Sequence, residues 1–291
     1  MQYRLLRRSA AFLSRLSWIS LQGMASVAAF CFWHLAPSRR REAVEALKKH
    51  LRFSQKEAER VARASFRENF LSFLEIFHAD RFFMDSSVSA TYTQKVKVLL
   101  QQEKAPIVIA TAHLGSWELM PGLGADLLPN RKRMVVVRRQ KNEALNRVMA
   151  ELRGTRGMLA VDHRNAAAVV LPELRAGGVV AFLVDHNTSR KEAVFLPFLE
   201  DIAAVNIGPA SLALRAKAAV YPVFLLRDGK GGHILHVLPP LHTADLQGSI
   251  RERVRRIAVF YTDAVASMVR QYPEQWFWMH KRWKTRQNDG S

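Results

Sequence analysis

The sequence has only one cysteine, Cys31, among its 291 residues. A single cysteine excludes an internal disulfide and a cysteine-rich zinc site, so the fold must be held by its hydrophobic core. Hydrophobic residues make up 49% of the chain, which is enough for such a core and argues against a disordered chain. Internal repeats and low-complexity segments are also lacking in the sequence. The length is sufficient for one large α/β domain or two small ones.

Acidic residues are scarce as well. Asp and Glu together number 25 against 44 Lys and Arg, which gives a formal net charge of +19. Such a charge attracts polyanions, namely nucleic acid, anionic lipid headgroups or an acidic protein. Arginines at positions 4, 7, 8 and 39–41 flank an apolar N-terminal segment, which favours a membrane surface. The sequence lacks a nucleic-acid-binding motif, so we expect no nucleic-acid partner.

Residues 16–38 carry no formally charged side chain. About 20 helical residues, each rising about 1.5 Å, cross the ~30 Å hydrocarbon core of a bilayer, so this segment is long enough. Serine, glutamine and histidine dilute its apolar character. Three interpretations remain open: a membrane anchor that spans the bilayer or lies in its interface, a cleaved signal peptide, and the buried first helix of a soluble domain. We expect an N-terminal membrane-anchoring helix within residues 1–38, followed by one domain over residues 39–291.

Short apolar runs alternate with helical patterns in the second half of the chain. Before them, Ser54 and Glu57 have capping-box spacing at the start of a long amphipathic helix. Runs typical of buried strands lie at 107–111, 134–137, 157–161, 179–184, 220–226 and 233–238. Helical patterns lie at 142–152, 165–176, 209–217 and 250–272. This alternation predicts an α/β fold with a mixed, largely parallel sheet flanked by helices.

A histidine and a glutamate follow the first of these strands. His113 lies just past the strand end, where side chains of open α/β sheets project into the crevice that binds ligands. Gly115 permits a tight turn, Ser116 is suited to cap the next helix, and Glu118 follows. Across a strand–turn–helix junction, the H-x4-E spacing can bring His113 and Glu118 together. The carboxylate would then fix the imidazole tautomer, and the other ring nitrogen would take a proton from a hydroxyl.

The H-x4-E spacing by itself is a weak signal. A zinc site would need further ligands at suitable spacing, and the sequence offers none nearby, so we expect no metal. Several further segments stand beside H-x4-E as recognisable motifs. They are R-x-x-K-N at 138–142, R-x-x-x-G at 153–157, L-R-x-G at 174–177, the segments 208–213 and 219–222, and PEQWFWMHKRWKTR at 273–286. Together these segments resemble the bacterial lipid A secondary acyltransferase family, the late acyltransferases that add lauroyl or myristoyl chains. The resemblance spans nearly the whole chain, and its last block is the most specific.

The resemblance implies a glycerolipid-acyltransferase-like fold at the cytoplasmic face of the bacterial inner membrane. It implies an O-acyltransferase that moves a fatty acyl chain from an acyl carrier protein thioester to a hydroxyl of an anionic lipid, first of all a lipid A precursor. His113 would be the general base, and Glu118 would orient and charge its imidazole. Arg138, or backbone N–H groups near Gly115, would stabilise the oxyanion. No cofactor is implied.

Three further residues are candidates for substrate contacts. Arg138 and Arg153 are alternatively suited to an acceptor phosphate, because arginine offers a planar fork of donors. Asp185 ends a buried strand and either supports the site or makes a structural hydrogen bond. His163 and His186 would lie near the cleft, but neither carries a second signal.

Two departures from the family pattern concern the acceptor. The usual Asp-Gln is Asp185-His186 here, and residues 197–201 lack a glycine often found there. The acceptor therefore stays open between a lipid A precursor, another glycolipid and a lysophospholipid-like molecule. An alternative of another class is a membrane-associated binding protein with this fold and no catalysis, against which the intact His113 and Glu118 argue.

Overall fold

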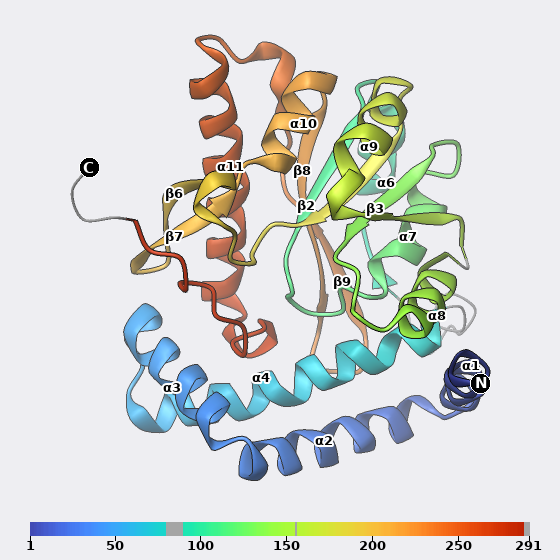
Figure 1. The fold of residues 1–291 in the computed structure, drawn as a ribbon, viewed down its shortest axis with the longest axis vertical. Coiled ribbons are helices and arrows are strands. Elements are labelled where there is room, and N and C mark those ends of the chain that lie inside the picture. Colours follow the sequence, from blue (N-terminus) through green and yellow to red (C-terminus); the bar gives the residue numbers. More distant parts are fainter. Residues whose placement is uncertain (80–89, 155, 288–291) are drawn as a thin grey trace.

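An eight-stranded sheet forms the centre of the computed structural model, which describes residues 1–79, 90–154 and 156–287 (Figure 1). The strand order is β1-β9-β8-β2-β5-β3-β4, and β10 pairs with β8. β9 and β10 run antiparallel to β8, whereas the other neighbouring pairs are parallel. The strands are β1 (Ala90–Thr91), β2 (Ile107–Thr111), β3 (Arg133–Val137), β4 (Met158–Asp162), β5 (Val179–Leu183), β8 (Ala219–Arg227), β9 (His233–Val237) and β10 (Leu241–His242). The predicted mixed, largely parallel sheet is confirmed.

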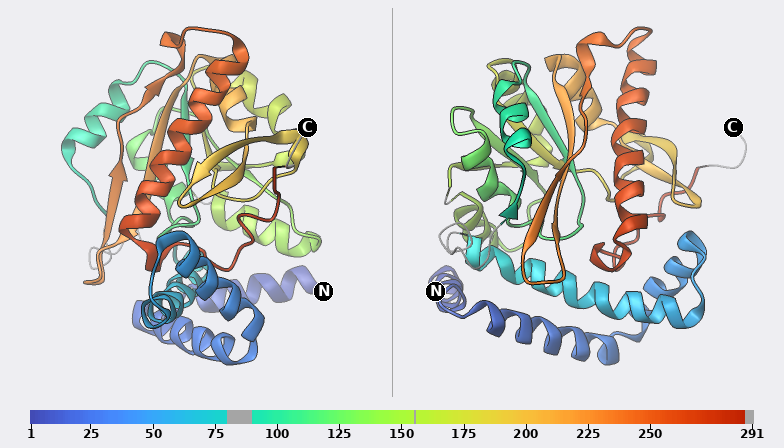
Figure 2. Two further views of the ribbon diagram at one scale, coloured as in Figure 1. Left: turned by 90° about the vertical axis from the view of Figure 1, so that its left-hand side faces the viewer. Right: turned by 180° about the vertical axis from the view of Figure 1, so that it is seen from behind.

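Helices cover both faces of this sheet (Figure 2). They are α6 (Gln94–Gln102), α7 (Met120–Leu127), α8 (Glu143–Gly154), α9 (Ala166–Arg175), α10 (Gly208–Ala216) and α11 (Ile250–Gln271). Successive residues of a strand point to opposite faces, as β2 illustrates. Ile107 packs with α6 and α7, and its neighbour Val108 packs with α9, α10 and α11. Burial on both faces explains why the strands are continuous apolar runs.

A separate hairpin pairs β6 (Ala193–Phe198) with β7 (Asp201–Asn206) in antiparallel register. The sequence did not lead us to expect it. Its turn contains Leu199 with φ +57°, a conformation usually taken by glycine or asparagine. The usual sequence signal for a hairpin turn is therefore lacking.

Four N-terminal helices pack beneath the sheet: α1 (Gln2–Leu13), α2 (Trp18–Leu35), α3 (Pro37–Leu51) and α4 (Gln55–Glu75). The capping box of Ser54 and Glu57 at the start of α4 is confirmed. Leu21 and Ala25 of α2 are fully buried against α4. Within the described ranges, no single helix is long and apolar enough to cross a bilayer. The pair of α1 and α2 is long and apolar enough when taken together, but the two helices are bent by 117° relative to each other.

Candidate active site

The turn after β2 is fixed by contacts with β8 and α4. Gly115 has φ +67°, and a Cβ there would lie 2.2 Å from the carbonyl oxygen of Leu225, so only glycine fits. The Gly115 carbonyl oxygen accepts a hydrogen bond from Ser72 Oγ at 2.6 Å. Ser116 Oγ donates to Glu75 Oε1 at 3.1 Å, and α7 begins farther along the chain without a side-chain cap. The tight turn at Gly115 is confirmed, and the predicted cap by Ser116 is wrong.

This turn presents His113 to the carboxylate of Asp185. His113 Nδ1 lies 2.9 Å from Asp185 Oδ1. The other oxygen, Oδ2, accepts the backbone N–H of His113 at 2.9 Å and the indole N–H of Trp276 at 2.8 Å. Asp185 is only 2% exposed, whereas the side chain of His113 is 28% exposed. The carboxylate thus holds the imidazole in one orientation through Nδ1. It does not contact the other ring nitrogen, Nε2.

Strand register explains why these two residues meet. β2 and β5 are adjacent parallel strands in which Thr111 pairs with Leu183. The pairing continues through the backbone N–H of Val184, which donates to the Thr111 carbonyl oxygen at 2.8 Å. His113 and Asp185 each lie two residues beyond this pair, so the neighbouring strands bring them side by side. We had expected Asp185 to be either a support of the site or a structural residue, and its carboxylate lies against His113.

Glu118 has a different partner. Arg153 of α8 donates from Nε to Glu118 Oε2 at 2.9 Å and from Nη2 to Oε1 at 2.6 Å. Both side chains are largely buried, with exposures of 18% for Arg153 and 8% for Glu118. A planar guanidinium matches both carboxylate oxygens at once, which an imidazole cannot do. The expected hydrogen bond between Glu118 and His113 is therefore not formed, and Asp185 occupies that place on the ring.

Opposing effects set the pKa of His113. Burial disfavours its charged form, but the charge and hydrogen bond of Asp185 favour that form, and the charge of Glu118 adds to them. The pKa of His113 is raised as a result. Burial acts against the Asp185 carboxylate too, yet His113 and Trp276 hold its pKa well below its usual range. Asp185 thus stays ionised beside a ring that readily accepts a proton.

A cavity of about 1570 Å³ opens in front of His113. Glu118, Arg138 and Arg153 line it as well, so it joins four of the five predicted site residues. Asp185 is buried and meets the cavity only through His113. Apolar side chains complete the lining, among them Phe73, Trp117, Val136, Phe182 and Leu183. Apolar walls with a few cationic groups suit a ligand that carries both hydrocarbon and negative charge.

The predicted oxyanion donors differ in whether they are already hydrogen-bonded within the fold. The backbone N–H of Gly115 donates to the Gln275 carbonyl oxygen at 3.1 Å, and that of Ser116 donates to the Leu225 carbonyl oxygen at 2.8 Å. Both amides are therefore occupied within the fold. Arg138 faces the cavity and remains as the expected donor.

The C-terminal segment supplies a residue that sequence reasoning missed. The backbone N–H of Phe277 donates to the His113 carbonyl oxygen at 3.0 Å, and Leu114 forms a β-bridge with Trp276. The Trp276 side chain is fully buried and donates to Asp185, as described above. Its signal was its position in block 273–286, the most specific part of the resemblance. His163 and His186 also line the cavity, as expected for residues near the cleft.

Among the residues that the structure describes, no three His, Cys, Asp or Glu side chains are grouped to hold a metal ion. The arrangement instead offers a base, its buried carboxylate partner and a second ion pair.

The sequence is similar to those of known acyltransferases. The family model for the bacterial lipid A biosynthesis acyltransferase matches residues 18–285. The lipid A biosynthesis lauroyltransferase of Escherichia coli (strain K12) is 30% identical over 138 residues, which are 46% of this chain and 42% of that protein. The palmitoleoyltransferase of the same organism is 25% identical over 189 residues, 64% of this chain and 58% of that protein. A phosphatidylinositol mannoside acyltransferase of Mycolicibacterium smegmatis is 26% identical over 181 residues, 60% of this chain and 56% of that protein.

The matches to these relatives span about half of their length. The match to the family model, by contrast, runs through most of this chain and includes the turn at His113, the strand end at Asp185 and the segment with Trp276. The chain therefore belongs to the bacterial lipid A biosynthesis acyltransferase family.

Proposed function

We propose that this chain is an O-acyltransferase that moves a fatty acyl chain from an acyl carrier protein thioester to a hydroxyl of a lipid A precursor or a related glycolipid. One observation carries the proposal: the imidazole of His113, held by the buried Asp185, lies at the wall of a cavity of about 1570 Å³. A base placed at such a wall can activate a bound hydroxyl. Membership in an acyltransferase family supports acyl transfer as the reaction.

In the proposed reaction, His113 Nε2 accepts the proton of the acceptor hydroxyl while the hydroxyl oxygen attacks the thioester carbonyl carbon. The carbonyl electrons move to oxygen and give a tetrahedral oxyanion. Its collapse completes the ester and breaks the carbon–sulfur bond, and His113 returns its proton to the leaving thiolate. Attack is direct, without a covalent acyl-enzyme, and Cys31 is an exposed residue of α2.

Asp185 is proposed to position His113 and to stabilise the imidazolium that forms during attack. This role differs from the substrate contact for which Asp185 was a candidate, because both carboxylate oxygens are already engaged by His113 and Trp276. Glu118 is proposed to act on His113 through its charge, which raises the pKa of the ring without a hydrogen bond. It also holds Arg153 at the cavity wall.

Arg138 is proposed to meet the developing oxyanion or an acceptor phosphate. Its guanidinium lines the same cavity as His113, and arginine suits either anion. An Arg138→Gln variant distinguishes the two roles. Loss of kcat with an unchanged acceptor KM supports oxyanion stabilisation, and a raised acceptor KM with kcat retained supports phosphate binding.

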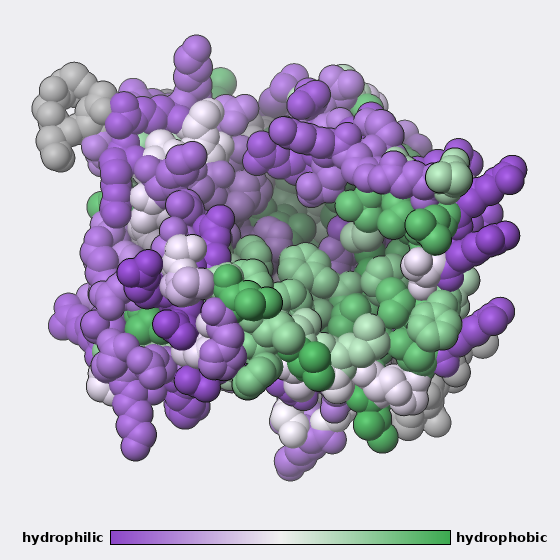
Figure 3. All heavy atoms as spheres, turned by 60° about the horizontal axis from the view of Figure 1, so that its bottom comes forward, coloured by the Kyte–Doolittle hydropathy of each residue, from purple (hydrophilic) through white to green (hydrophobic). Residues whose placement is uncertain are grey.

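The N-terminal helices are proposed to bind the cytoplasmic face of the bacterial inner membrane. Large apolar side chains of α2 face outward, with exposures of 80% for Ile19, 68% for Phe30 and 81% for Leu35. Figure 3 shows apolar side chains gathered beside a hollow at this end of the molecule. Such a surface is unfavourable in water and suits a lipid interface, to which the +19 charge adds attraction.

The helix on which α2 packs, α4, also reaches the cavity. Phe73 of α4 is 43% exposed and also lines the cavity with His113. A lipid acceptor would therefore reach His113 directly from the membrane.

The choice of acceptor rests on the functions for which the relatives are named. Two of them act in lipid A biosynthesis, and the mycobacterial relative acylates a phosphatidylinositol mannoside. The latter keeps another phosphorylated glycolipid as the second candidate. His186 stands where the family usually has glutamine and lines the cavity, so it is a site where acceptor choice can differ.

Transfer by the purified full chain tests the proposal. The assay contains detergent–phospholipid micelles, an acyl carrier protein thioester and either a lipid A precursor or a phosphatidylinositol mannoside. We expect a singly acylated product by mass spectrometry with one of the two acceptors, and none with His113→Ala. Failure of the wild type with every lipid acceptor would support the non-catalytic binding protein instead.

A further inference from the structure

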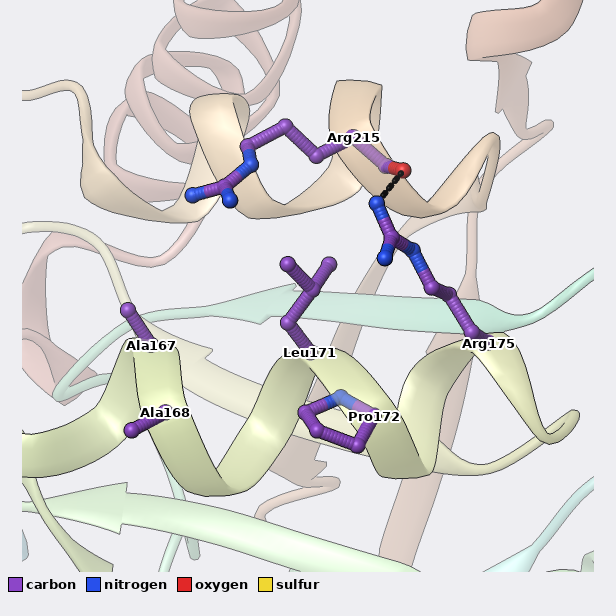
Figure 4. A pocket seen from close by; sticks show the side chains of 6 residues that line it. All are labelled: Ala167, Ala168, Leu171, Pro172, Arg175 and Arg215. Atoms are coloured by element: carbon purple, nitrogen blue, oxygen red, sulfur yellow. Dashed lines mark hydrogen bonds between the residues drawn. The ribbon is translucent and has the colours of Figure 1, made fainter.

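A second cavity, of about 560 Å³, lies between α9 and α10 (Figure 4). Its floor is apolar and contains Leu171 and Pro172, and its rim carries Arg175 and Arg215. Arg215 and Ala167 line both this groove and the large cavity in front of His113. The groove therefore adjoins the candidate active site.

The two arginines of the rim are not neutralised locally. Both are exposed, and Arg175 Nη2 donates to the backbone carbonyl oxygen of Arg215 at 3.5 Å. Within the described part of the chain, neither guanidinium forms an ion pair with a carboxylate. By contrast, Arg139 and Arg147 near the large cavity are paired with glutamates of α8. The groove rim thus presents free positive charge that attracts an anionic partner.

The groove also has a direction. Ala167 lies in the first turn of α9, near the large cavity, and Arg175 is its last residue. The 10 residues of this helix span about 15 Å at about 1.5 Å per residue. α9 and α10 lie at the end of the molecule opposite α1 and α2 (Figure 1). A partner at Arg175 would therefore approach from the side away from the proposed membrane contact.

We propose that an acidic acyl carrier protein docks on Arg175 and Arg215, and that its phosphopantetheine arm follows the groove toward His113. The acidic surface and the phosphate at the root of the arm match the two guanidinium groups, and the apolar floor accommodates the arm. A soluble donor and a membrane lipid would then enter from opposite ends. This inference rests on the proposed function, because it takes a carrier protein as the acyl donor.

Charge reversal at the rim tests the docking site. Arg215→Glu retains the hydrogen bond from Arg175, which uses a backbone oxygen, and Arg175→Glu/Arg215→Glu reverses both charges. Lys95→Glu, an exposed change on α6 at the other face of the sheet, is the matched control. Each protein is assayed with the carrier thioester and with a small acyl-pantetheine thioester that lacks the carrier. Thermal melts verify folding, and Arg175→Gln/Arg215→Gln replaces any reversal that does not fold.

We expect the double reversal to raise KM for the carrier thioester about tenfold and the KM for the small thioester much less, because only the carrier brings an acidic surface to the rim. Lys95→Glu should match the wild type. An unchanged carrier KM, an equal rise with Lys95→Glu, or an equal rise for both donors would overturn the docking site. A wild type that uses the small thioester and never the carrier thioester overturns the proposed donor itself, which is a separate result.

Discussion

His113 and Asp185 lie 72 residues apart in the sequence, and 2.9 Å separates Nδ1 of the histidine from Oδ1 of the aspartate. The contact results from the register of β2 and β5, in which Thr111 pairs with Leu183. Trp276 completes it from the C-terminal segment by donating to the same carboxylate at 2.8 Å. The candidate base is thus supported by two regions of the chain that are distant from it in sequence.

The pH dependence of acyl transfer should follow the raised pKa of His113. The neutral imidazole is the base, so kcat/KM should fall as the pH drops below this pKa. Glu118→Gln removes a charge that favours the imidazolium, and we expect the inflection to move to lower pH, with kcat largely retained at alkaline pH. Profiles of kcat/KM against pH for both proteins measure the shift. An inflection at the same pH would mean that the Glu118 charge does not act on the ring.

Removing one member of the Glu118–Arg153 ion pair should destabilise the fold more than removing both charges. Arg153→Ala leaves a largely buried carboxylate without its partner, and we expect the free energy of unfolding to fall by about 2–4 kcal/mol. Glu118→Gln/Arg153→Gln removes both charges and should recover part of that loss. Urea denaturation measures both. A single variant as stable as the wild type would contradict the burial of the pair.

Gly115 should not tolerate a side chain. Gly115→Ala places a methyl group against the Leu225 carbonyl oxygen at a positive φ, so we expect a loss of more than about 2 kcal/mol of stability and of most activity. Gly229→Ala is the control, because Gly229 has φ +75° but open space around its Cβ position. Thermal melts and transfer assays of both variants separate the collision from the φ strain. Equal effects of the two substitutions would exclude a special role for the close contact.

Acid should destabilise the fold through two histidines, of which His50 is buried and His280 is partly buried. Burial lowers the pKa of His50 and of His280 to about 4, below the unfolded value of 6.5. Between these values the unfolded chain binds more protons, so stability is lost as the pH falls through this range, by ~1–2 kcal/mol per histidine at about pH 5. His50 is stacked on Trp283 with 3.6 Å between the ring centroids. The His50→Phe substitution keeps an aromatic ring in this place but removes the group that titrates.

The measurement is the difference in unfolding free energy between about pH 7 and pH 5. We expect a smaller difference in His50→Phe than in the wild type. The same difference in both proteins would show that His50 titrates normally in the fold.

Local patterns were sufficient for most of the sheet. The predicted strand at 107–111 has the observed bounds of β2, and the helical pattern at 250–272 differs from α11 by one residue. These elements are continuous apolar runs or strongly periodic segments, whose signal lies within the element itself. The hairpin of β6 and β7 was missed because its turn at Leu199 lacks a turn residue.

The partner of His113 could not be predicted from the sequence for a different reason. Sequence spacing indicated Glu118, the carboxylate closest along the chain, whereas the side chain that meets the ring follows a neighbouring strand. Strand order and register are tertiary properties, and they decide which residues past each strand end meet. The role of Trp276 depends likewise on a segment that returns to the turn at Leu114.

The central claim is that His113 and Asp185 act together as the base of an acyltransferase. Single-turnover transfer by the wild type, His113→Ala, Asp185→Asn and the double variant tests it most directly. We predict that each single variant is slower by at least about a hundredfold, and that the double variant is no slower than His113→Ala, because the two residues act as one unit. A folded Asp185→Asn protein that transfers at the wild-type rate would contradict the claim.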